Sequence, residues 1–166
     1  MACMIEVATI RRVREPYGIL GNMSAHKVTY GEIRWRTCEA LFQALRFPAD
    51  SPVRELIRQE VSPMGAKAVA KSRVDLMSVE PLSEADLDNM RAVLRLKYNE
   101  HASVRECLAA TRDKLIVEDC TRRQRGSGLF WGAALAGDKW RGDNWLGKLW
   151  MEIRSEQRAE ESQVSA

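Results

Sequence analysis

The sequence has 166 residues, of which 45% are hydrophobic, and a formal net charge of +3. This length and composition are typical of one globular domain with a substantial core. No apolar run approaches the roughly 18–20 residues that span a bilayer, and the first ten residues lack the basic and then apolar layout of a signal peptide. We therefore expect a soluble, cytoplasmic protein with no membrane partner.

The four cysteines are widely spaced, form no C-x-x-C pair and have only two histidines to join them. This pattern predicts neither a zinc site nor a disulfide framework, so no metal and no cofactor are expected. Nineteen of the 26 cationic residues are arginine. Planar guanidinium groups suit phosphate recognition, but surface arginine is also common, so charge alone leaves contact with nucleic acid or nucleotides open.

The first third of the chain alternates predicted strands with loops. Met4 to Ile10 is rich in β-branched residues and predicts a strand. Pro16 to Ser24 contains proline and two glycines, which favour a loop. Such a loop can bring backbone N–H groups and the Asn22 amide to a ligand, or it can be a structural turn. Lys27 to Trp35 then predicts a small hairpin that turns at Tyr30-Gly31-Glu32.

The segment Trp35 to Phe47 predicts a short helix with two distinct faces. An apolar stripe for the core is formed by Cys38, Leu41, Phe42 and Leu45. A second, polar face carries Glu39, Gln43 and Arg46 at the same helical spacing. With Thr37 as N-cap, Glu39 lies in the first turn, where free backbone N–H groups and the helix dipole favour an ionised carboxylate. A simple capping role and a catalytic role are both compatible with this placement.

Two Ser-Pro pairs begin the next helices. Ser51-Pro52 predicts a helix that ends near Glu60, and Ser62-Pro63 predicts one that runs to Arg73. The second helix places Lys67 and Lys71 one turn apart, where like charges repel each other. A phosphate bound between them would relieve the repulsion, and the repulsion would also favour a reactive amine. Two solvated lysines remain the alternative.

The second half combines scaffold helices with a basic loop. Helices are predicted from a Ser83 cap to Asn99 and from His101 to Thr111, followed by a strand at 114–119. Thr121 to Gly128 is a basic loop that precedes Trp131, a pairing that suits a ligand with phosphate and base or is simply a surface loop. A linker at 133–141 has no assigned structure. The last helix begins with Asp143 as N-cap, and the polar tail at 156–166 is expected to fray.

The ordered set of motifs resembles the NADAR superfamily (NAD- and ADP-ribose-associated proteins), from about Tyr17 to Arg154. The segments that carry the resemblance are Tyr17-Gly18 through Asn22, Thr37-x-Glu39-x-x-x-Gln43-Ala44-x-x-Phe47, Ser62-Pro63-Met64-x-Ala66-Lys67, Met90 to Lys97-Tyr98, Leu108-x-x-Thr111, Trp131-Gly132, and Gly142-x-Asn144-x-Leu146-Gly147-x-x-x-Met151-x-Ile153-Arg154. The resemblance implies a single compact α+β domain over residues 1–155, predominantly helical with a small β-sheet, and an N-glycosidase activity without metal.

The resemblance also implies roles for individual residues. The carboxylate of Glu39 would stabilise a cationic, oxocarbenium-like ribose or activate water. Lys67 would act as a second catalytic group, either through phosphate and ribose contact or as an amine that forms an imine. Trp131 offers a surface on which a base can stack. Further substrate contacts are expected from Gly21, Asn22, Gln43, Arg46, Lys71, Gly132, Asp143 and Asn144.

Departures from the family pattern indicate the branch. Members that act on riboflavin-pathway intermediates usually have histidine after the motif glutamate, where Ala40 stands, and aspartate where Gly128 stands. A tryptophan usual after the lysine helix is also missing at 74–81. The arginine-rich loops and these departures favour removal of ADP-ribose from guanine in nucleic acid, countering an ADP-ribosyltransferase toxin. An N-glycosidase of riboflavin-pathway intermediates and a non-catalytic module that binds ADP-ribose or nucleotides are the alternatives.

Overall fold

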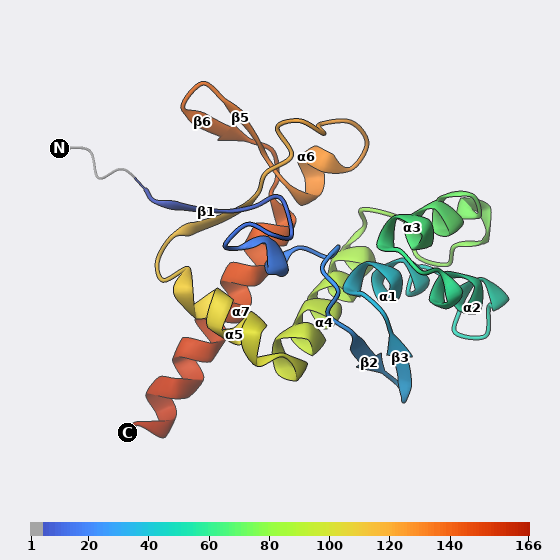
Figure 1. Cartoon of the computed structure of the whole chain (residues 1–166), viewed down its shortest axis with the longest axis horizontal. Coiled ribbons are helices and arrows are strands. Elements are labelled where there is room, and N and C mark those ends of the chain that lie inside the picture. The colour runs from blue at the N-terminus through green and yellow to red at the C-terminus, as the bar shows by residue number, and fades with distance from the viewer. Residues whose placement is uncertain (1–4) are drawn as a thin grey trace. The chain divides into compact units, whose positions relative to one another are not determined.

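The computed structural model describes residues 5–166 and groups them into two compact units (Figure 1). The inserted unit is the continuous segment Asn22–Ala102. The split unit combines the described residues up to Gly21 with Ser103–Ala166. Each unit is described by itself below. Met4, the predicted start of the first strand, lies outside the described residues.

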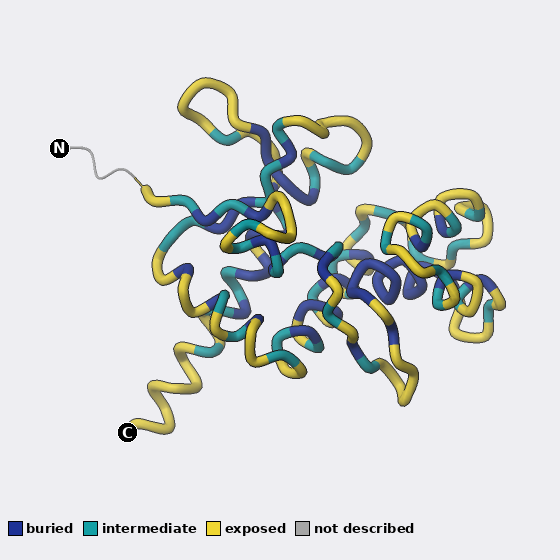
Figure 2. Tube along the Cα trace, in the orientation of Figure 1, coloured by how far each residue is buried: buried dark blue, intermediate teal, exposed yellow. Residues whose placement is uncertain are grey.

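The inserted unit is helical with one hairpin. Its elements are β2 (Val28–Tyr30), β3 (Ile33–Trp35), α1 (Cys38–Ala44), α2 (Pro52–Gln59), α3 (Pro63–Lys71), the 3-10 turn η2 (Val74–Leu76) and α4 (Glu84–Glu100). Helix α1 contacts α2, α3, α4 and both strands of the hairpin. Because it is covered on every side, all residues from Thr37 to Phe47 are buried, as the continuous dark blue of this segment shows in Figure 2.

Local capping signals determine where these helices begin. The Thr37 hydroxyl accepts a hydrogen bond from Ala40 N at 3.1 Å, which confirms the predicted N-cap of α1. The hydroxyls of Ser51, Ser62 and Ser83 cap α2, α3 and α4 in the same way, as predicted. The predicted hairpin is also confirmed, and its two strands pair antiparallel from Val28–Trp35 to Tyr30–Ile33.

The split unit is built around a pair of parallel strands. Its elements are β1 (Val7–Ile10), the 3-10 turn η1 (Gly18–Leu20), α5 (Ala102–Ala110, all but its first residue), β4 (Leu115–Glu118), α6 (Gly128–Trp131), β5 (Ala134–Ala136), β6 (Lys139–Arg141) and α7 (Trp145–Val164). Strands β1 and β4 pair in register from Val7–Leu115 to Ile10–Glu118, and α7 packs against β4. Trp150, fully buried on α7, donates a hydrogen bond to Leu20 O at 2.7 Å and fixes η1.

The α+β, predominantly helical fold class is confirmed, and the structure changes or adds four details. The β structure of the described residues is divided among three two-stranded ladders. The linker at 133–141 is a hairpin, β5–β6, that turns at Gly137 with φ of 66°. Asp143 is not the N-cap of the last helix, because Asn144 holds that position in a left-handed conformation. The tail from Glu156 does not fray but continues α7 to Val164.

None of the helices described between residues 5 and 166 has both the length and the apolar composition needed to cross a bilayer.

Candidate functional site

The carboxylate of Glu39 lies at the start of α1, inside the inserted unit. Glu39 is in the first helical turn, as predicted, and its backbone N–H donates to Asn22 O at 3.2 Å. Only 6% of the residue is exposed. A carboxylate is rarely buried without partners, because removing it from water is costly. The groups around Glu39 therefore decide what it can do.

A chain of hydrogen bonds fixes the orientation of this carboxylate. Gln43 Nε2 donates to Glu39 Oε1 at 2.8 Å, and Gln43 Oε1 accepts from Arg46 Nη1 at 3.2 Å. The donor direction of the Gln43 amide is set by this second bond, because only its oxygen can accept from a guanidinium group. The other oxygen of Glu39, Oε2, receives no hydrogen bond from the described residues. The sequence placed Glu39, Gln43 and Arg46 on one face, and the structure joins them.

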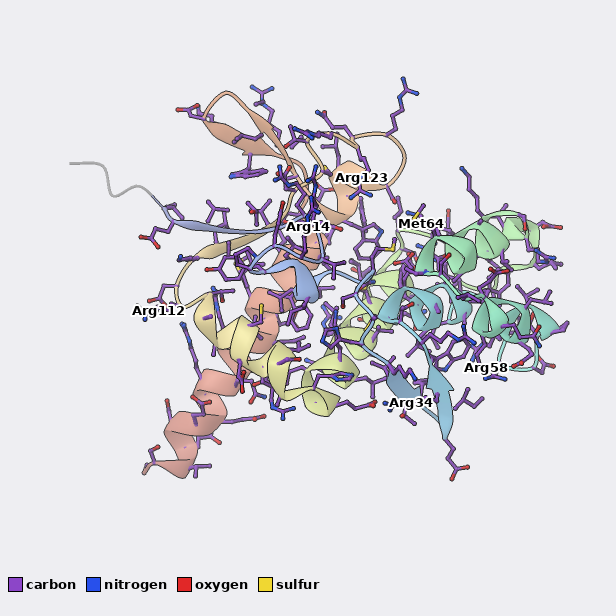
Figure 3. All side chains as sticks on the ribbon, viewed as in Figure 1. Arg14, Arg34, Arg58, Met64, Arg112 and Arg123 are labelled. Atoms are coloured by element: carbon purple, nitrogen blue, oxygen red, sulfur yellow. The ribbon has the colours of Figure 1, made fainter. Side chains whose placement is uncertain are left out.

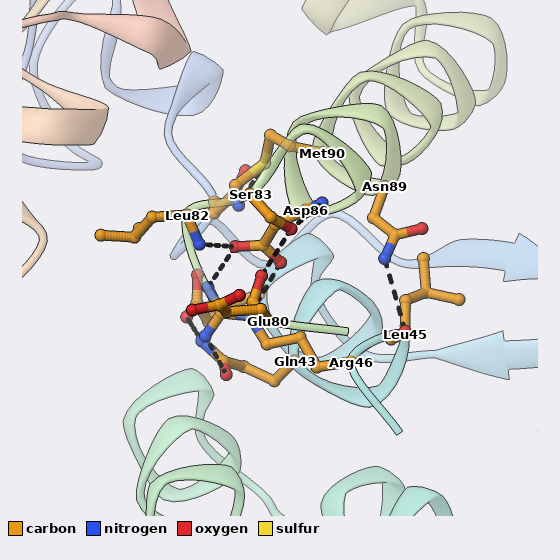
Figure 4. Close-up of polar contacts among 11 residues, drawn as sticks. Gln43, Leu45, Arg46, Glu80, Leu82, Ser83, Asp86, Asn89 and Met90 are labelled. Carbon is orange, nitrogen blue, oxygen red and sulfur yellow. Dashed lines mark hydrogen bonds and ion pairs between the residues drawn. The ribbon is translucent and has the colours of Figure 1, made fainter. Parts of the chain in front are cut away.

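Asp86 anchors the far end of this chain (Figure 4). Arg46 Nε and Nη2 reach its two oxygens at 2.9 and 2.7 Å, a bidentate pair in which the Asp86 side chain is fully buried. Asp86 Oδ2 also accepts from Leu82 N at 2.8 Å. The guanidinium of Arg46 stacks over the Phe42 ring at 4.6 Å. The result is a rigid relay, Glu39–Gln43–Arg46–Asp86, in the core of the inserted unit.

Sequence reasoning missed Asp86. The only local signal is its place three residues after the Ser83 cap, which is typical of a capping box. Ser83 Oγ does accept from Asp86 N at 3.3 Å, but the carboxylate turns to Arg46, forty residues earlier in the chain. Such a tertiary pair leaves no mark in a single sequence.

Asn22 presents an unpaired acceptor beside the relay. Its Nδ2 donates to Met90 Sδ at 3.1 Å, while its Oδ1 is buried without any hydrogen-bond partner. An unsatisfied buried polar atom costs about 1–3 kcal/mol, so its retention calls for a functional explanation. The backbone bond from Glu39 N to Asn22 O places this acceptor next to the first turn of α1. A hydroxyl or N–H of a ligand would satisfy it.

The two predicted lysines lie on the exposed side of α3. Lys67 and Lys71 are exposed, whereas the residue before each of them, Ala66 and Ala70, is fully buried. Helix α3 packs against α1 in the same unit. Both ammonium groups are therefore accessible to a ligand, as the phosphate interpretation requires. Whether they contact substrate stays a prediction.

A second buried polar cluster lies in the same unit. Lys97, fully buried in α4, donates to Ser24 Oγ at 2.7 Å, and His26 Nδ1 lies 2.9 Å from the same oxygen. Burial, followed by the positive charge of Lys97, lowers the pKa of His26. Burial likewise raises the pKa of the Cys38 thiol to about 11. The sequence identified Lys97 only as part of a scaffold helix, because its helical spacing is that of a core position.

The other predicted site residues belong to the split unit, and several have structural roles there. Asn144 Oδ1 accepts from Glu118 N at 3.0 Å and its Nδ2 donates to Ile116 O at 2.8 Å, so its amide is used in joining α7 to β4. A side chain at Gly132 would collide with the carbonyl oxygen of Glu118. Trp131 is 9% exposed and packs edge-to-face with the Phe130 ring at 4.9 Å.

Gly21 ends η1 in the split unit, and its N–H donates to Gly18 O at 3.0 Å. Asp143 is exposed, and its N–H donates to Leu129 O at 2.7 Å. The structure thus joins Glu39, Gln43 and Arg46 directly, and it places the five remaining predicted residues in the other unit: Gly21, Trp131, Gly132, Asp143 and Asn144. Substrate contact by those five residues stays a prediction.

Comparison with known proteins identifies the family. The model of the NADAR domain matches residues 10–158. The chain belongs to the NADAR family. The NADAR match includes the whole relay and all the predicted site residues, so the buried carboxylate lies within the shared domain.

Curated NADAR relatives are named as N-glycosidases. An N-glycosidase of Nostoc punctiforme is 31% identical over 130 residues, which cover 73% of this chain and 75% of the relative. The N-glycosidase YbiA of Escherichia coli strain K12 is 34% identical over 104 residues, which cover 63% of this chain and 64% of YbiA. The NMR structure of Escherichia coli YbiA superimposes with a TM-score of 0.77 at 29% identity, over 96% of this chain and 89% of that one. This chain therefore shares its NADAR fold with YbiA.

Proposed function

We propose that this protein is an N-glycosidase that removes ADP-ribose from ADP-ribosylated guanine in nucleic acid, with Glu39 as the catalytic carboxylate. The observation that carries the proposal is the buried Glu39 side chain, held at one oxygen by Gln43 at 2.8 Å, in a family whose curated relatives are N-glycosidases. A fixed carboxylate with one free oxygen is the group that this reaction needs beside the anomeric carbon.

The chemistry follows from the bond that breaks. Cleavage of the bond between C1 of the ribose and the base nitrogen sends the bonding electrons to the base and leaves positive charge on C1 and the ring oxygen. A carboxylate oriented before the reaction stabilises that charge without reorganisation. Glu39 Oε2 would face C1 and either stabilise the cation or accept a proton from the attacking water. The relay from Gln43 to Asp86 keeps this oxygen in place.

Other groups of the inserted unit would hold the sugar and its phosphates. The unpaired Asn22 Oδ1 suits a ribose hydroxyl as donor, which explains why a buried acceptor is left open. Lys67 and Lys71, exposed on α3, suit the phosphates of the ADP-ribose moiety. The arginine-rich composition and the departures at Ala40 and Gly128 favour ADP-ribosylated guanine as the substrate. Such an enzyme would work as the counterpart of an ADP-ribosyltransferase.

The test compares Glu39→Gln with the wild-type protein on an ADP-ribosylated guanine oligonucleotide, with released ADP-ribose measured by mass spectrometry. Glutamine keeps the size of the side chain but removes its charge, so turnover falls by about a hundredfold or more. Binding of the oligonucleotide is largely kept. The matched control is Glu32→Gln, which removes an exposed carboxylate of the same unit at the hairpin turn and leaves turnover unchanged.

A parallel reaction with a phosphoribosylated aminopyrimidine of the riboflavin pathway separates the substrates. Consumption of this compound without release of ADP-ribose would refute the substrate assignment but keep the N-glycosidase. Binding of ADP-ribose without turnover of either compound would instead support the non-catalytic module. Equal turnover by Glu39→Gln and wild type would remove Glu39 from the mechanism.

A further inference from the structure

The split unit contains an open cleft in which arginines from two distant segments meet. The cleft has a volume of about 680 Å³, and we call it the arginine cleft. Its lining includes Arg11, Arg12, Arg122, Arg123, Leu135 and Gly137. All of these residues belong to the split unit, and none takes part in the Glu39 relay.

The parallel sheet explains why these arginines converge. Arg11 and Arg12 directly follow β1, and Arg122 and Arg123 follow β4 after a bridge between Asp119 and Ala133. Because the two strands are parallel and adjacent, the segments that follow them leave the sheet at the same end. This end of a parallel sheet is where binding crevices commonly form. The basic loop that the sequence singled out is thus brought against a second basic segment about 110 residues away.

Hydrogen bonds connect the acidic and hydroxyl side chains that line the cleft. Asp119 Oδ1 accepts from Thr121 N at 2.9 Å, and the Thr121 hydroxyl accepts from Leu135 N at 2.9 Å. Arg11 forms an ion pair with Glu15 at 2.8 Å, which raises the pKa of Arg11 above its ordinary value. Asp119, a carboxylate of the cleft lining, thus has a hydrogen-bond donor within the split unit, and Glu15 holds Arg11.

The other three guanidinium groups form no ion pair among the described residues, although the charge of Arg12 contributes to lowering the pKa of Glu15. Arg12, Arg122 and Arg123 are exposed, and within residues 5–166 none of them forms an ion pair. Three unpaired positive charges around one cleft repel each other and are not explained by stability. A bound polyanion would neutralise them, and guanidinium groups bind phosphate oxygens in bidentate fashion.

Further cations extend the positive surface beyond the cleft. Arg14 and Arg125 lie in the flanking loops, and Lys139 and Arg141 lie on β6; all four are exposed. Figure 3 labels Arg14 of this surface and Arg123 of the cleft. These cations are more numerous than the contacts that a single phosphate group can make. Trp140 pairs with Leu135 across the hairpin, so its ring lies on the same face as a residue of the cleft wall and offers a stacking platform.

We propose that the arginine cleft binds the phosphate backbone of a single-stranded nucleic acid, and that it recruits the strand that carries the modified base. Only the second part, recruitment of a strand with a modified base, rests on the proposed function. Strand binding itself follows from the unpaired guanidinium groups and the nearby aromatic ring. It is therefore tested on a strand that carries no ADP-ribose.

The experiment measures fluorescence anisotropy of a labelled single strand of about 16 nucleotides, between about 50 and 200 mM salt. The variant combines Arg12→Gln, Arg122→Gln and Arg123→Gln in the full chain. Each lost phosphate contact reduces the slope of log affinity against log salt by about 0.7, so the slope becomes shallower by about 2. We expect the variant to bind at least about tenfold more weakly at low salt, with circular dichroism unchanged.

The matched control also removes three guanidinium groups, through Arg34→Gln, Arg58→Gln and Arg158→Gln, whose side chains are 40 to 55% exposed. These arginines are paired with carboxylates outside the cleft, and the control keeps the affinity and the salt slope of the wild type. Equal affinity of the cleft variant and wild type, or an equal loss in the control, would overturn the proposal. Preferential binding of poly-glutamate over the oligonucleotide would overturn it too, in favour of an acidic protein partner.

The two proposals fail separately. Strand binding that depends on the cleft, in a wild-type protein that releases no ADP-ribose from the ADP-ribosylated guanine oligonucleotide, would support the cleft and refute the proposed function. Release of ADP-ribose from a modified guanosine nucleoside without measurable strand binding would do the reverse.

Discussion

Removal of the Asp86 carboxylate should strongly destabilise the protein. The Asp86 side chain is fully buried and accepts three hydrogen bonds, two from Arg46 and one from Leu82 N. Asp86→Ala therefore leaves a guanidinium group, 10% exposed, without its counter-charge and a backbone N–H without its acceptor. Breaking one side of a buried ion pair costs about 3–5 kcal/mol, a large share of the roughly 5–15 kcal/mol that stabilises a typical domain.

A double-mutant cycle with Arg46→Met separates the pair from its surroundings. Arg46→Met alone leaves the Asp86 carboxylate buried and unpaired, so it is also destabilising. The double variant removes both charges and should lose less than the sum of the two single variants, with a coupling of about 1–3 kcal/mol. The assay is urea unfolding followed by circular dichroism, with midpoints compared at equal m-values.

Additive losses in that cycle would refute the reasoning, because they would mean that the two side chains do not depend on each other. The exposed pair of Arg58 with Glu55 on α2 provides the control. Its N···O distance, 2.6 Å, is as short as that of the buried pair, but both side chains are at least 40% exposed. The same cycle there should show no measurable coupling, since water screens the pair.

Two further predictions concern titratable groups of the inserted unit. Burial lowers the folded-state pKa of His26 below its ordinary value of 6.5, and the charges of Lys97 and His101 lower it further. The unfolded chain therefore binds the proton more readily than the folded protein. The contribution of His26 to the free energy of unfolding is complete above pH 6.5 and is lost as the pH falls. His26→Gln should flatten the loss of urea midpoint between about pH 7 and pH 5, and an unchanged slope would contradict the assignment. The Cys38 thiol, with a pKa raised to about 11 by burial, should resist iodoacetamide in the native protein and react after unfolding; peptide mass spectrometry that finds Cys38 alkylated in the native state would contradict its burial.

Local signals carried most of the helix predictions in the inserted unit. The caps at Thr37, Ser51, Ser62 and Ser83 are short-range hydrogen bonds between a side chain and the next turn, so a sequence displays them directly. The polar face of α1 was also evident, because helical spacing alone aligns Glu39 with Gln43 and Arg46. The sequence did not reveal that this face is buried, since the helices that cover it come from distant segments.

The incorrect predictions come from positions where tertiary contacts decide. Asp143 is a residue type that often caps helices. The side-chain amide of Asn144 hydrogen-bonds to β4, and the N-cap of α7 lies at Asn144, one residue later than predicted. The tail from Glu156 is mostly polar and yet is rich in good helix formers, and Arg158 connects it to Asp113 at 2.8 Å. The β5–β6 hairpin lies in the segment that the sequence left without assigned structure, because strands of only three residues give a weak signal.

The order of the two units along the chain also governs biosynthesis. The inserted unit is one uninterrupted segment that precedes β4, so all of it emerges from the ribosome before β4 does. Strand β1, by contrast, must wait for a partner more than a hundred residues downstream. During that interval β1 is an unpaired strand on a growing polypeptide, open to chaperones and to mispairing with other nascent chains. Translation speed across the inserted segment therefore sets how long this vulnerable interval lasts.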